Sequence, residues 1–301
     1  IHAAWSDGES GFKLTPASDG ADSGTDGHIT GTILLTLEGT EESETIIVNL
    51  TIQPKFAVTF ASGSTSAVGT APTQETVTAD TEITLPANPY TYYGMNFTGW
   101  SDGTNTYQAS SFYTMPAHNV TFTARWTNDV WDGAAKSDSL KGNGTADDPY
   151  IIASGADLNY LSNWNGTYCD RYYKLMADID MGNHKMAPIY RLTGTFDGNG
   201  HKITNLKIES SDVYYGLFKD AGNSGTAAVI KNLTLENAAI NDTKSTNSGK
   251  LGLLVSRAVE FLTIEDCYVT GSITTASKPY MDVGGLVGQA QGANVTISRC
   301  Y

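Results

Sequence analysis

The stretch LTGTFDGNGHKITNLKI (192–208) joins a turn-rich corner, FDGNGH, to a segment in which apolar and polar residues alternate. Its second half, ITNLKI (203–208), aligns with IKNLTL (230–235), IEDCYV (264–269) and ISRCY (297–301), whose starts lie 27, 34 and 33 residues apart. A strand–turn–strand unit repeating at this period cannot bury its own apolar face, whereas stacked units can. The repeat therefore predicts a parallel β-solenoid.

The aligned segments also predict a bend. Positions one, four and six are mostly apolar, yet strict alternation would place positions one and six on opposite faces. Position four aligns Leu206, Leu233, Cys267 and Cys300 as one buried ladder. In-register parallel neighbours point their Cβ atoms side by side, which disfavours a disulfide. With Cys169 the cysteines form an odd, sparse set, so we predict reduced thiols without a redox or metal role.

The corner itself is predicted to be structural. Gly198 and Gly200 are expected to take positive φ at a tight turn. Asp197 and Asn199 are turn formers that bond to nearby backbone. A strand rather than a helix follows the corner, so no helix N-terminus is available to hold a phosphate.

Composition narrows the functional classes. The chain has 301 residues, enough for two or three domains, and 40% of them are hydrophobic, enough for real cores. The net charge of −14 argues against nucleic acid and anionic membranes, because phosphate binding needs clustered Lys and Arg. No apolar run reaches 18 residues, so no membrane-spanning segment is expected.

Alternation elsewhere predicts an all-β protein. Strands are expected in TILLTL (32–37), TIIVNLTI (45–52), FAVTF (56–60) and NVTFTARW (119–126). GADLNYLSNW (155–164) is the one segment with a helical pattern.

Three segments are expected. Residues 1–54 suggest part of an Ig-like sandwich or another small β module, followed by a second unit at 55–127 and the solenoid at 128–301. The sequence stops in mid-strand at Tyr301, so we expect a longer natural chain.

The middle unit contains four ordered pieces, VTF (58–60), LPANPY (85–90), GMNFTGW (94–100) and TMPAHNVTFTARW (114–126). In these pieces it resembles the Listeria–Bacteroides repeat, a small β-grasp-like module of bacterial surface proteins. The family usually has a Gly-Gly turn where this chain has ASGS (61–64). The resemblance implies a spacer or adhesion module without catalysis.

Five aromatic residues of this unit are candidates for a core or a binding role. Trp100 and Trp126 end its two most apolar strands and are predicted to anchor its core. Tyr90, Tyr92 and Tyr93 lie in a turn-rich segment and are expected to be exposed. They are candidates for stacking on a sugar or packing in an interface, or they cap a hydrophobic edge.

The last unit contains GNGTADDPYIIASGADLNYLSN (142–163), YYKLMADIDMGNHKMAPI (172–189), GTFDGNGHKITNL (194–206) and MDVGGLVGQAQGANVTISRCY (281–301). These segments are similar to the leader and the repeat of GLUG-repeat proteins, which are right-handed β-helices of bacterial surface proteins. Met186 departs from the family, where Trp often stands. The resemblance implies a right-handed parallel β-helix.

Candidate cation ligands are few. Asp19, Asp22 and Asp26 share one polar loop, but their spacing fits no EF-hand. Asp178 and Asp180 stand two apart on a predicted strand and so share a face, where they could bind a cation or a sugar. We predict no cofactor or metal, with calcium the ion left open.

No catalytic constellation is predicted. His184 and His201 are isolated histidines without metal-ligand spacing to a partner. Glu265 and Asp266 are expected to form a surface ion pair with Arg299. Glycoside hydrolysis needs a carboxylate pair at a set separation, and no such pair is evident.

The functional expectation is a non-catalytic adhesin on a bacterial cell surface. Its stalk modules would present the β-helix to an extracellular glycan or host protein, and the chain is expected to be monomeric. Two alternatives stay open: a carbohydrate-active β-helix or an accessory region of a larger surface enzyme, and a structural spacer without a ligand.

Overall fold

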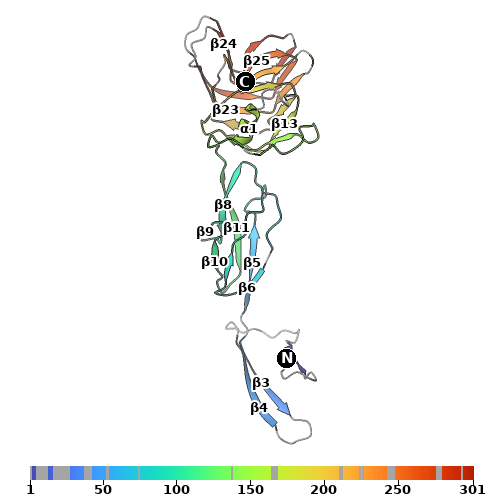
Figure 1. Ribbon diagram of the computed structural model, residues 1–301, viewed down its shortest axis with the longest axis vertical. Helices are drawn as coiled ribbons and strands as arrows, with labels where there is room; N and C mark the ends of the chain where they lie inside the picture. The colour runs from blue at the N-terminus through green and yellow to red at the C-terminus, as the bar shows by residue number, and fades with distance from the viewer. Residues whose placement is uncertain are drawn as a thin grey trace. The chain divides into compact units, whose positions relative to one another are not determined.

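A computed structural model describes most of the chain (Figure 1). Before residue 54, the described part of the chain is the backbone of four strands. From there the described residues are 54–301 apart from 74, 137, 164–168, 210–212, 224, 226, 243–247, 276–279 and 293. Within these residues the chain forms strands joined by turns and a single helix. The predicted all-β class is confirmed.

The chain forms two compact units. The first consists of residues 1–63, 70–89 and 99–125. The second consists of residues 64–69, 90–98 and 126–301. The three predicted sequence modules stay a prediction.

Two antiparallel strand pairs lie in the N-terminal part of the chain. One joins β1 (His2–Ala4) to β2 (Lys13–Thr15), and the other joins β3 (His28–Thr36) to β4 (Ser43–Thr51). The second pair contains both strands that alternation predicted there. The Ig-like fold itself stays a prediction.

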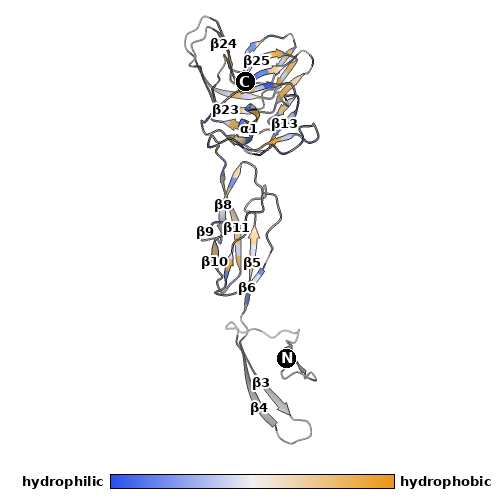
Figure 2. Cartoon of the chain, viewed as in Figure 1, coloured by the Kyte–Doolittle hydropathy of each residue, from blue (hydrophilic) through white to orange (hydrophobic). Residues whose placement is uncertain are grey.

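A five-stranded sheet follows, in the order β6-β5-β11-β8-β9, with β7 and β10 as a separate pair. The bounds are β5 (Lys55–Ala61), β6 (Glu75–Thr78), β7 (Glu82–Thr84), β8 (Met95–Ser101), β9 (Thr106–Tyr107), β10 (Phe112–Thr114) and β11 (Val120–Asn128). Strands β5 and β11 run parallel and place Phe60 opposite Phe122. Figure 2 colours these strands by hydropathy.

Trp100 is a core anchor, as predicted. Its side chain is fully buried, its ring lies 5.0 Å from that of Phe60, and its Nε1 donates to the carbonyl of Pro86 at 2.9 Å. Burial of so large a ring stabilises by roughly 25 cal/mol for each Å² of apolar surface removed from water. Trp126 is only partly buried and packs edge-on against Phe97.

Four parallel sheets fill the second unit (Figure 1). The first contains β12 (Tyr150–Ile152), β13 (Tyr172–Leu175), β17 (Thr195–Asp197), β22 (Ala228–Lys231), β26 (Leu262–Glu265) and β30 (Val295–Ser298). The second contains β14 (Ile179–Asp180), β15 (Lys185–Met186), β18 (Lys202–Thr204), β19 (Lys207–Ile208), β23 (Thr234–Asp242) and β27 (Tyr268–Thr275). The third contains β20 (Tyr214–Tyr215), β24 (Ser248–Gly252) and β28 (Tyr280–Gly284). The fourth contains β16 (Ile189–Leu192), β21 (Phe218–Gly222), β25 (Val255–Glu260) and β29 (Val287–Ala290).

Successive passes of the chain build these sheets together. We call a pass the stretch that begins with a strand of the first sheet and ends with a strand of the fourth, namely 172–192, 195–222, 228–260 and 262–290. Apolar side chains therefore stack in register from pass to pass. One such stack runs through Tyr173, Phe196, Ile230, Ile264 and Ile297.

The helix α1 (Gly155–Ser162) lies within the segment 155–164, for which the sequence predicts a helix. Ser154 caps its N-terminus by accepting from the amide of Asp157, whose own carboxylate accepts from the amide of Ala153. Leu158 and Leu161 are buried in the core of the parallel sheets. The described residues contain no helix long and apolar enough to cross a membrane.

The predicted bend inside the repeated segment is present. Asn232, Asp266 and Arg299 have φ of 54°, 52° and 52°, which is the left-handed region. Asn232 and Asp266 each stand between a strand of the first sheet and a strand of the second, and Arg299 directly follows β30 of the first sheet. Asn and Asp tolerate this conformation better than most residues, so two of the three corners suit their residue type.

The predicted side-chain ladder is only partly right. Leu233, Cys267 and Cys300 follow equivalent corners, and the thiols of Cys267 and Cys300 donate to carbonyls of the preceding pass. Leu206 is buried elsewhere, because Ile203 pairs with Leu235 instead of Ile230. The partner of Ile230 is Phe196.

The GNGH corner makes its pass two residues longer than the next one between these paired positions. Seven positions separate Phe196 from Ile203, whereas five separate their partners Ile230 and Leu235. The two extra residues lie in the corner. ITNLKI lies on β18 and β19 of the second sheet, whereas IKNLTL begins on β22 of the first sheet, so their sequence similarity does not match the spatial register.

Of the two glycines predicted to have positive φ in this corner, one does and the other does not. Gly200 has φ of +79°, as predicted, and Asp197 Oδ1 accepts from the amide of Asn199 at 2.8 Å. Gly198 does not have positive φ. A Cβ at Gly198 would instead lie 2.5 Å from Cα of Leu233 in the next pass. Gly198 is thus suited to close approach of two backbones.

The buried thiol of Cys267 provides a direct test of the core. All three cysteines are free, and desolvation by burial raises the pKa of Cys267 to about 12. At pH 8 only about one thiol in 10⁴ would be the reactive thiolate. We expect iodoacetamide at pH 8 to leave Cys267 unmodified in the folded chain and to modify it in guanidinium chloride, as read by peptide mass spectrometry. Alkylation of folded Cys267 at the rate of a free thiol would contradict this.

Candidate functional site

A pocket of about 460 Å³ lies within the second compact unit. It forms where a turn before β8 and the end of β11 meet the edge that carries β14 and β18. Its polar and aromatic lining consists of Tyr92, Tyr93, Asn128, Asp129, Asp178, Asp180, Lys202 and Thr204. We call it the tyrosine–aspartate pocket. It brings together two of the predicted ligand-binding tyrosines and two of the predicted cation-binding aspartates.

A tight turn positions the tyrosines. The amide of Met95 donates to the carbonyl of Tyr92 at 3.1 Å, and Gly94 takes φ of +73°. Gly94 is also sterically required, because a Cβ there would lie 2.6 Å from Cβ of Ala177. Its carbonyl accepts from the amide of Asp129 at 2.9 Å. These constraints fix the turn against two other segments of the pocket wall.

The two tyrosines in the pocket have different surroundings. Tyr92 packs edge-on against Trp126, with ring centroids 5.6 Å apart. Tyr93 lies below the ammonium of Lys141, whose Nζ is 5.7 Å from the ring centroid. Both are partly exposed, so each offers ring surface to a ligand. Tyr90, which was predicted to be exposed, is 8% exposed, and desolvation raises its pKa. The prediction of an exposed Tyr90 is therefore wrong.

Asp178 and Asp180 line the same pocket but also hold the fold together. Asp178 Oδ1 lies 3.1 Å from His201 Nδ1 and accepts from the amide of Lys202. Asp180 Oδ1 accepts from Asn205 Nδ2 at 2.8 Å and from the amide of Gly182. Each aspartate therefore connects its pass to the next one through Oδ1. Both aspartates thus stabilise the contact between passes and also line the pocket.

Metal binding receives no support from this geometry. Among the described residues, no three His, Cys, Asp or Glu side chains are grouped as a metal site. The loop with Asp19, Asp22 and Asp26 lies outside the described residues. Calcium binding by this loop therefore stays a prediction.

The pocket suits a ligand rich in hydroxyl groups. Carboxylates accept hydrogen bonds, and Asn128 and Lys202 can donate them. Three carboxylates and one ammonium line it, which disfavours an anionic ligand. Partly exposed aromatic rings beside polar groups are the usual lining of small-molecule pockets.

Asn128, Asp129 and Lys202 carry no signal in the sequence that marks them as pocket residues. Asn128 ends the apolar strand β11, and Asp129 directly follows it. Polar residues after a strand are common turn formers, so this position alone gave no functional signal. Only the fold brings them beside β14.

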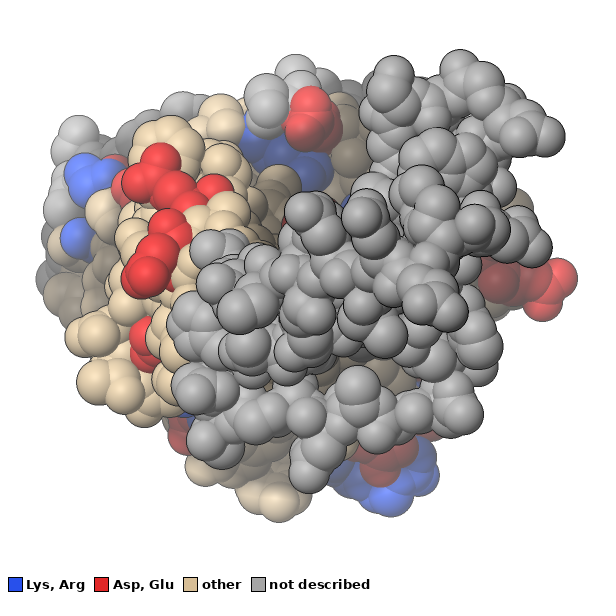
Figure 3. Space-filling model, turned by 90° about the horizontal axis from the view of Figure 1, so that it is seen from below, with Lys and Arg blue, Asp and Glu red and all other residues tan. Residues whose placement is uncertain are grey.

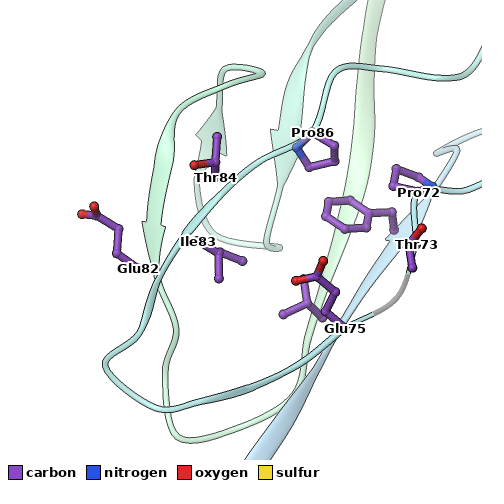
Figure 4. Close-up of a pocket in the computed structure, with 9 residues that line it drawn as sticks. Pro72, Thr73, Glu75, Glu82, Ile83, Thr84 and Pro86 are labelled. Atoms are coloured by element: carbon purple, nitrogen blue, oxygen red, sulfur yellow. The ribbon is translucent and has the colours of Figure 1, made fainter.

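A second cavity, of about 640 Å³, lies in the first unit between β5, β6 and β7 (Figure 4). Glu75 and Glu82 line it with Thr73 and Pro86. Figure 4 shows Glu82 pointing away from the other labelled side chains, whereas Glu75 points toward the cavity. This arrangement does not present the converging carboxylates that glycoside hydrolysis uses.

The predicted ion pair of the last corner is present. Arg299 Nη2 lies 2.7 Å from Asp266 Oδ2 and 3.3 Å from Glu265 Oε2. The hydrogen bond from Arg299 lowers the pKa of Asp266. Figure 3 shows acidic and basic side chains among uncharged ones on the described part of the face seen from below. Because this pair is exposed, it contributes little to stability.

No family model and no solved structure match the chain. Halomucin of Haloquadratum walsbyi is 33% identical over 173 residues, which are 52% of this chain and 2% of halomucin. A protein named as a Gly-rich membrane protein of Evansella cellulosilytica is 33% identical over 105 residues, which are 31% of this chain and 12% of that protein. The chain thus matches a small part of each relative's length.

Proposed function

We propose that the chain is a non-catalytic ligand-binding part of a bacterial cell-surface protein. Its last segment would be a right-handed parallel β-helix of the GLUG type, preceded by a Listeria–Bacteroides repeat. In-register parallel stacking of successive passes supports the β-helix. Similarity to halomucin over 173 residues is compatible with an extracellular location.

One observation carries the binding proposal. The tyrosine–aspartate pocket places Tyr92 and Tyr93 beside Asp129, Asp178 and Asp180. A neutral glycan fits this lining, because ring C–H groups stack on tyrosine while hydroxyls donate to carboxylates. The spacer alternative does not require such a pocket.

Tyr93→Ala and Asp129→Asn are each expected to weaken glycan binding by about tenfold. Tyr93→Ala removes the ring on which the sugar stacks. Asp129→Asn removes a hydrogen bond to a charged group, which contributes roughly 1.5–3 kcal/mol. The probe is an array of neutral oligosaccharides, read with and without EDTA. Tyr172→Ala is the matched control, because Tyr172 is exposed on another strand, outside the pocket.

The array also separates the alternatives. A specific signal lost in both pocket variants and kept in Tyr172→Ala would support the proposal. Release of new reducing ends from a bound glycan would favour the carbohydrate-active alternative. A blank array would overturn glycan binding and favour a protein ligand or a spacer.

A further inference from the structure

A second cluster of polar side chains lies on the parallel sheet of β16, β21 and β25, with one member on β20. It combines three cations, two aromatic rings and a buried carboxylate. We call it the cationic cluster. Its members are Tyr190, Arg191, Tyr214, Lys219, Asp220 and Arg257.

Strand register places the charges. Asp220 pairs with Arg191 on one neighbouring strand and with Arg257 on the other. Its Oδ1 lies 2.8 Å from Arg257 Nε, and its Oδ2 lies 3.3 Å from Arg191 Nη2. Asp220 is 2% exposed, so one buried carboxylate holds two guanidiniums in place. The Arg191 side chain is 36% exposed and that of Arg257 is 22% exposed.

Two aromatic rings lie beside the third cation. Lys219 Nζ lies 5.3 Å from the ring centroid of Tyr190 and 5.0 Å from that of Tyr214. The guanidinium of Arg257 lies 4.9 Å from the Tyr214 ring, and that of Arg191 lies 5.6 Å from the Tyr190 ring. Cation–π attraction restrains all three cations. The arrangement is thus preorganised, which lowers the entropic cost of binding a ligand.

These contacts determine which class of ligand the cationic cluster would bind. An anion at the cluster would meet up to three cations at once, and Arg gives bidentate geometry to carboxylate and to sulfate-like groups. Tyr190, 40% exposed, offers a ring beside them. An anionic group attached to a flat apolar face satisfies both features. The tyrosine–aspartate pocket, with its surplus of carboxylates, has the opposite preference.

We propose that the cationic cluster is a second binding site, for an anionic sugar. The sugar face stacks on Tyr190 or Tyr214, and its carboxylate or sulfate group binds Lys219 and the guanidiniums of Arg191 and Arg257. The anionic group is that of a uronic acid or of a sulfate ester. This site does not depend on the tyrosine–aspartate pocket.

The test compares matched ligands by calorimetry on the full chain. Trigalacturonate supplies carboxylates, its fully methyl-esterified form keeps the rings without charge, and a chondroitin sulfate oligosaccharide supplies sulfate. We expect at least one anionic probe to bind about tenfold more tightly than the ester, with affinity falling as salt rises. Carboxylate and sulfate sources differ in which probe binds.

Four variants complete the test. Lys219→Ala should weaken anionic binding by about tenfold, and Arg191→Lys should weaken it less, because charge is kept but bidentate geometry is lost. Lys185→Ala is the control, since Lys185 is exposed and paired with Glu209 on another sheet. Tyr93→Ala should leave anionic binding intact. Equal affinity for the ester and both anions, or unchanged binding in folded Lys219→Ala, would overturn the proposal.

Discussion

Replacing Gly198 by alanine is expected to lower the free energy of unfolding by about 3 kcal/mol, the upper end for overpacking a rigid site. The added Cβ would lie 2.4 Å from the carbonyl oxygen of Asn232 and 2.5 Å from Cα of Leu233. Both atoms belong to the backbone of the next pass, which cannot rotate away as a side chain can. The amide of Gly198 also donates to the carbonyl of Lys231 at 2.8 Å, so relief by separation would cost this hydrogen bond.

Gly200→Ala is the matched control, two residues away in the same corner. Gly200 has φ of +79°, and a Cβ there would meet nothing within 4 Å. Only the left-handed backbone penalty applies, about 1 kcal/mol. Urea unfolding of the two variants, followed by circular dichroism, measures both values. If Gly200→Ala were the more damaging of the two, positive φ rather than close approach would dominate the corner.

This pair of glycines shows what the sequence could and could not predict. Residue types identify a corner at FDGNGH and predict that it is structural, and positive φ at Gly200 follows from them. Close approach at Gly198 depends on which residue lies in the next pass. That neighbour is Leu233, 35 positions further along the chain, and only the strand register reveals it.

The repeat shows the same limit. Periodicity predicted parallel stacking, and the bend inside each segment followed from the failure of strict alternation. The four segments look equivalent in sequence, but Ile203 lies in the second sheet while Ile230 lies in the first. Apolar β-branched residues suit both places, so residue type could not fix the register.

The candidate site could be predicted from the sequence even less than the strand register could, because only tertiary structure brings its residues together. Tyr92, Tyr93, Asp178 and Asp180 were singled out from the sequence for separate reasons, and nothing in the sequence placed them together. Tyr90 belongs to the same apparent cluster but is buried. A turn-rich composition does not distinguish a tyrosine that caps a core from one that lines a pocket.

Replacing Asp220 by asparagine is expected to lower the free energy of unfolding by about 3 kcal/mol, because removing one partner of a buried ion pair leaves uncompensated charge. Arg191 and Arg257 would face each other across a neutral, 2% exposed side chain. Water reaches part of both guanidiniums, which keeps the loss at the low end of the range for buried pairs. Urea unfolding measures it.

Glu236→Gln is the matched control for Asp220→Asn. Glu236 pairs with Lys202 at 3.3 Å across neighbouring strands, but both side chains are nearly half exposed. The change is expected to stay within about 0.5 kcal/mol, the range for surface pairs. Similar losses in the two variants would contradict a special role for burial at Asp220.

A triple replacement separates stability from binding at the cationic cluster. Arg191→Met, Asp220→Leu and Arg257→Met together remove all three charges, and such replacements are often neutral or stabilising because desolvation offsets the attraction within buried ion networks. We expect the triple variant to unfold at a urea concentration close to that of the unchanged chain, well above that of Asp220→Asn. It should nevertheless bind the anionic sugar probes as weakly as Lys219→Ala or more weakly, since two of three cations are gone.

Stability recovered with binding lost would mean that Asp220 is kept to position cations for a ligand. Stability lost in both variants would mean that the charged triad is needed for the fold itself.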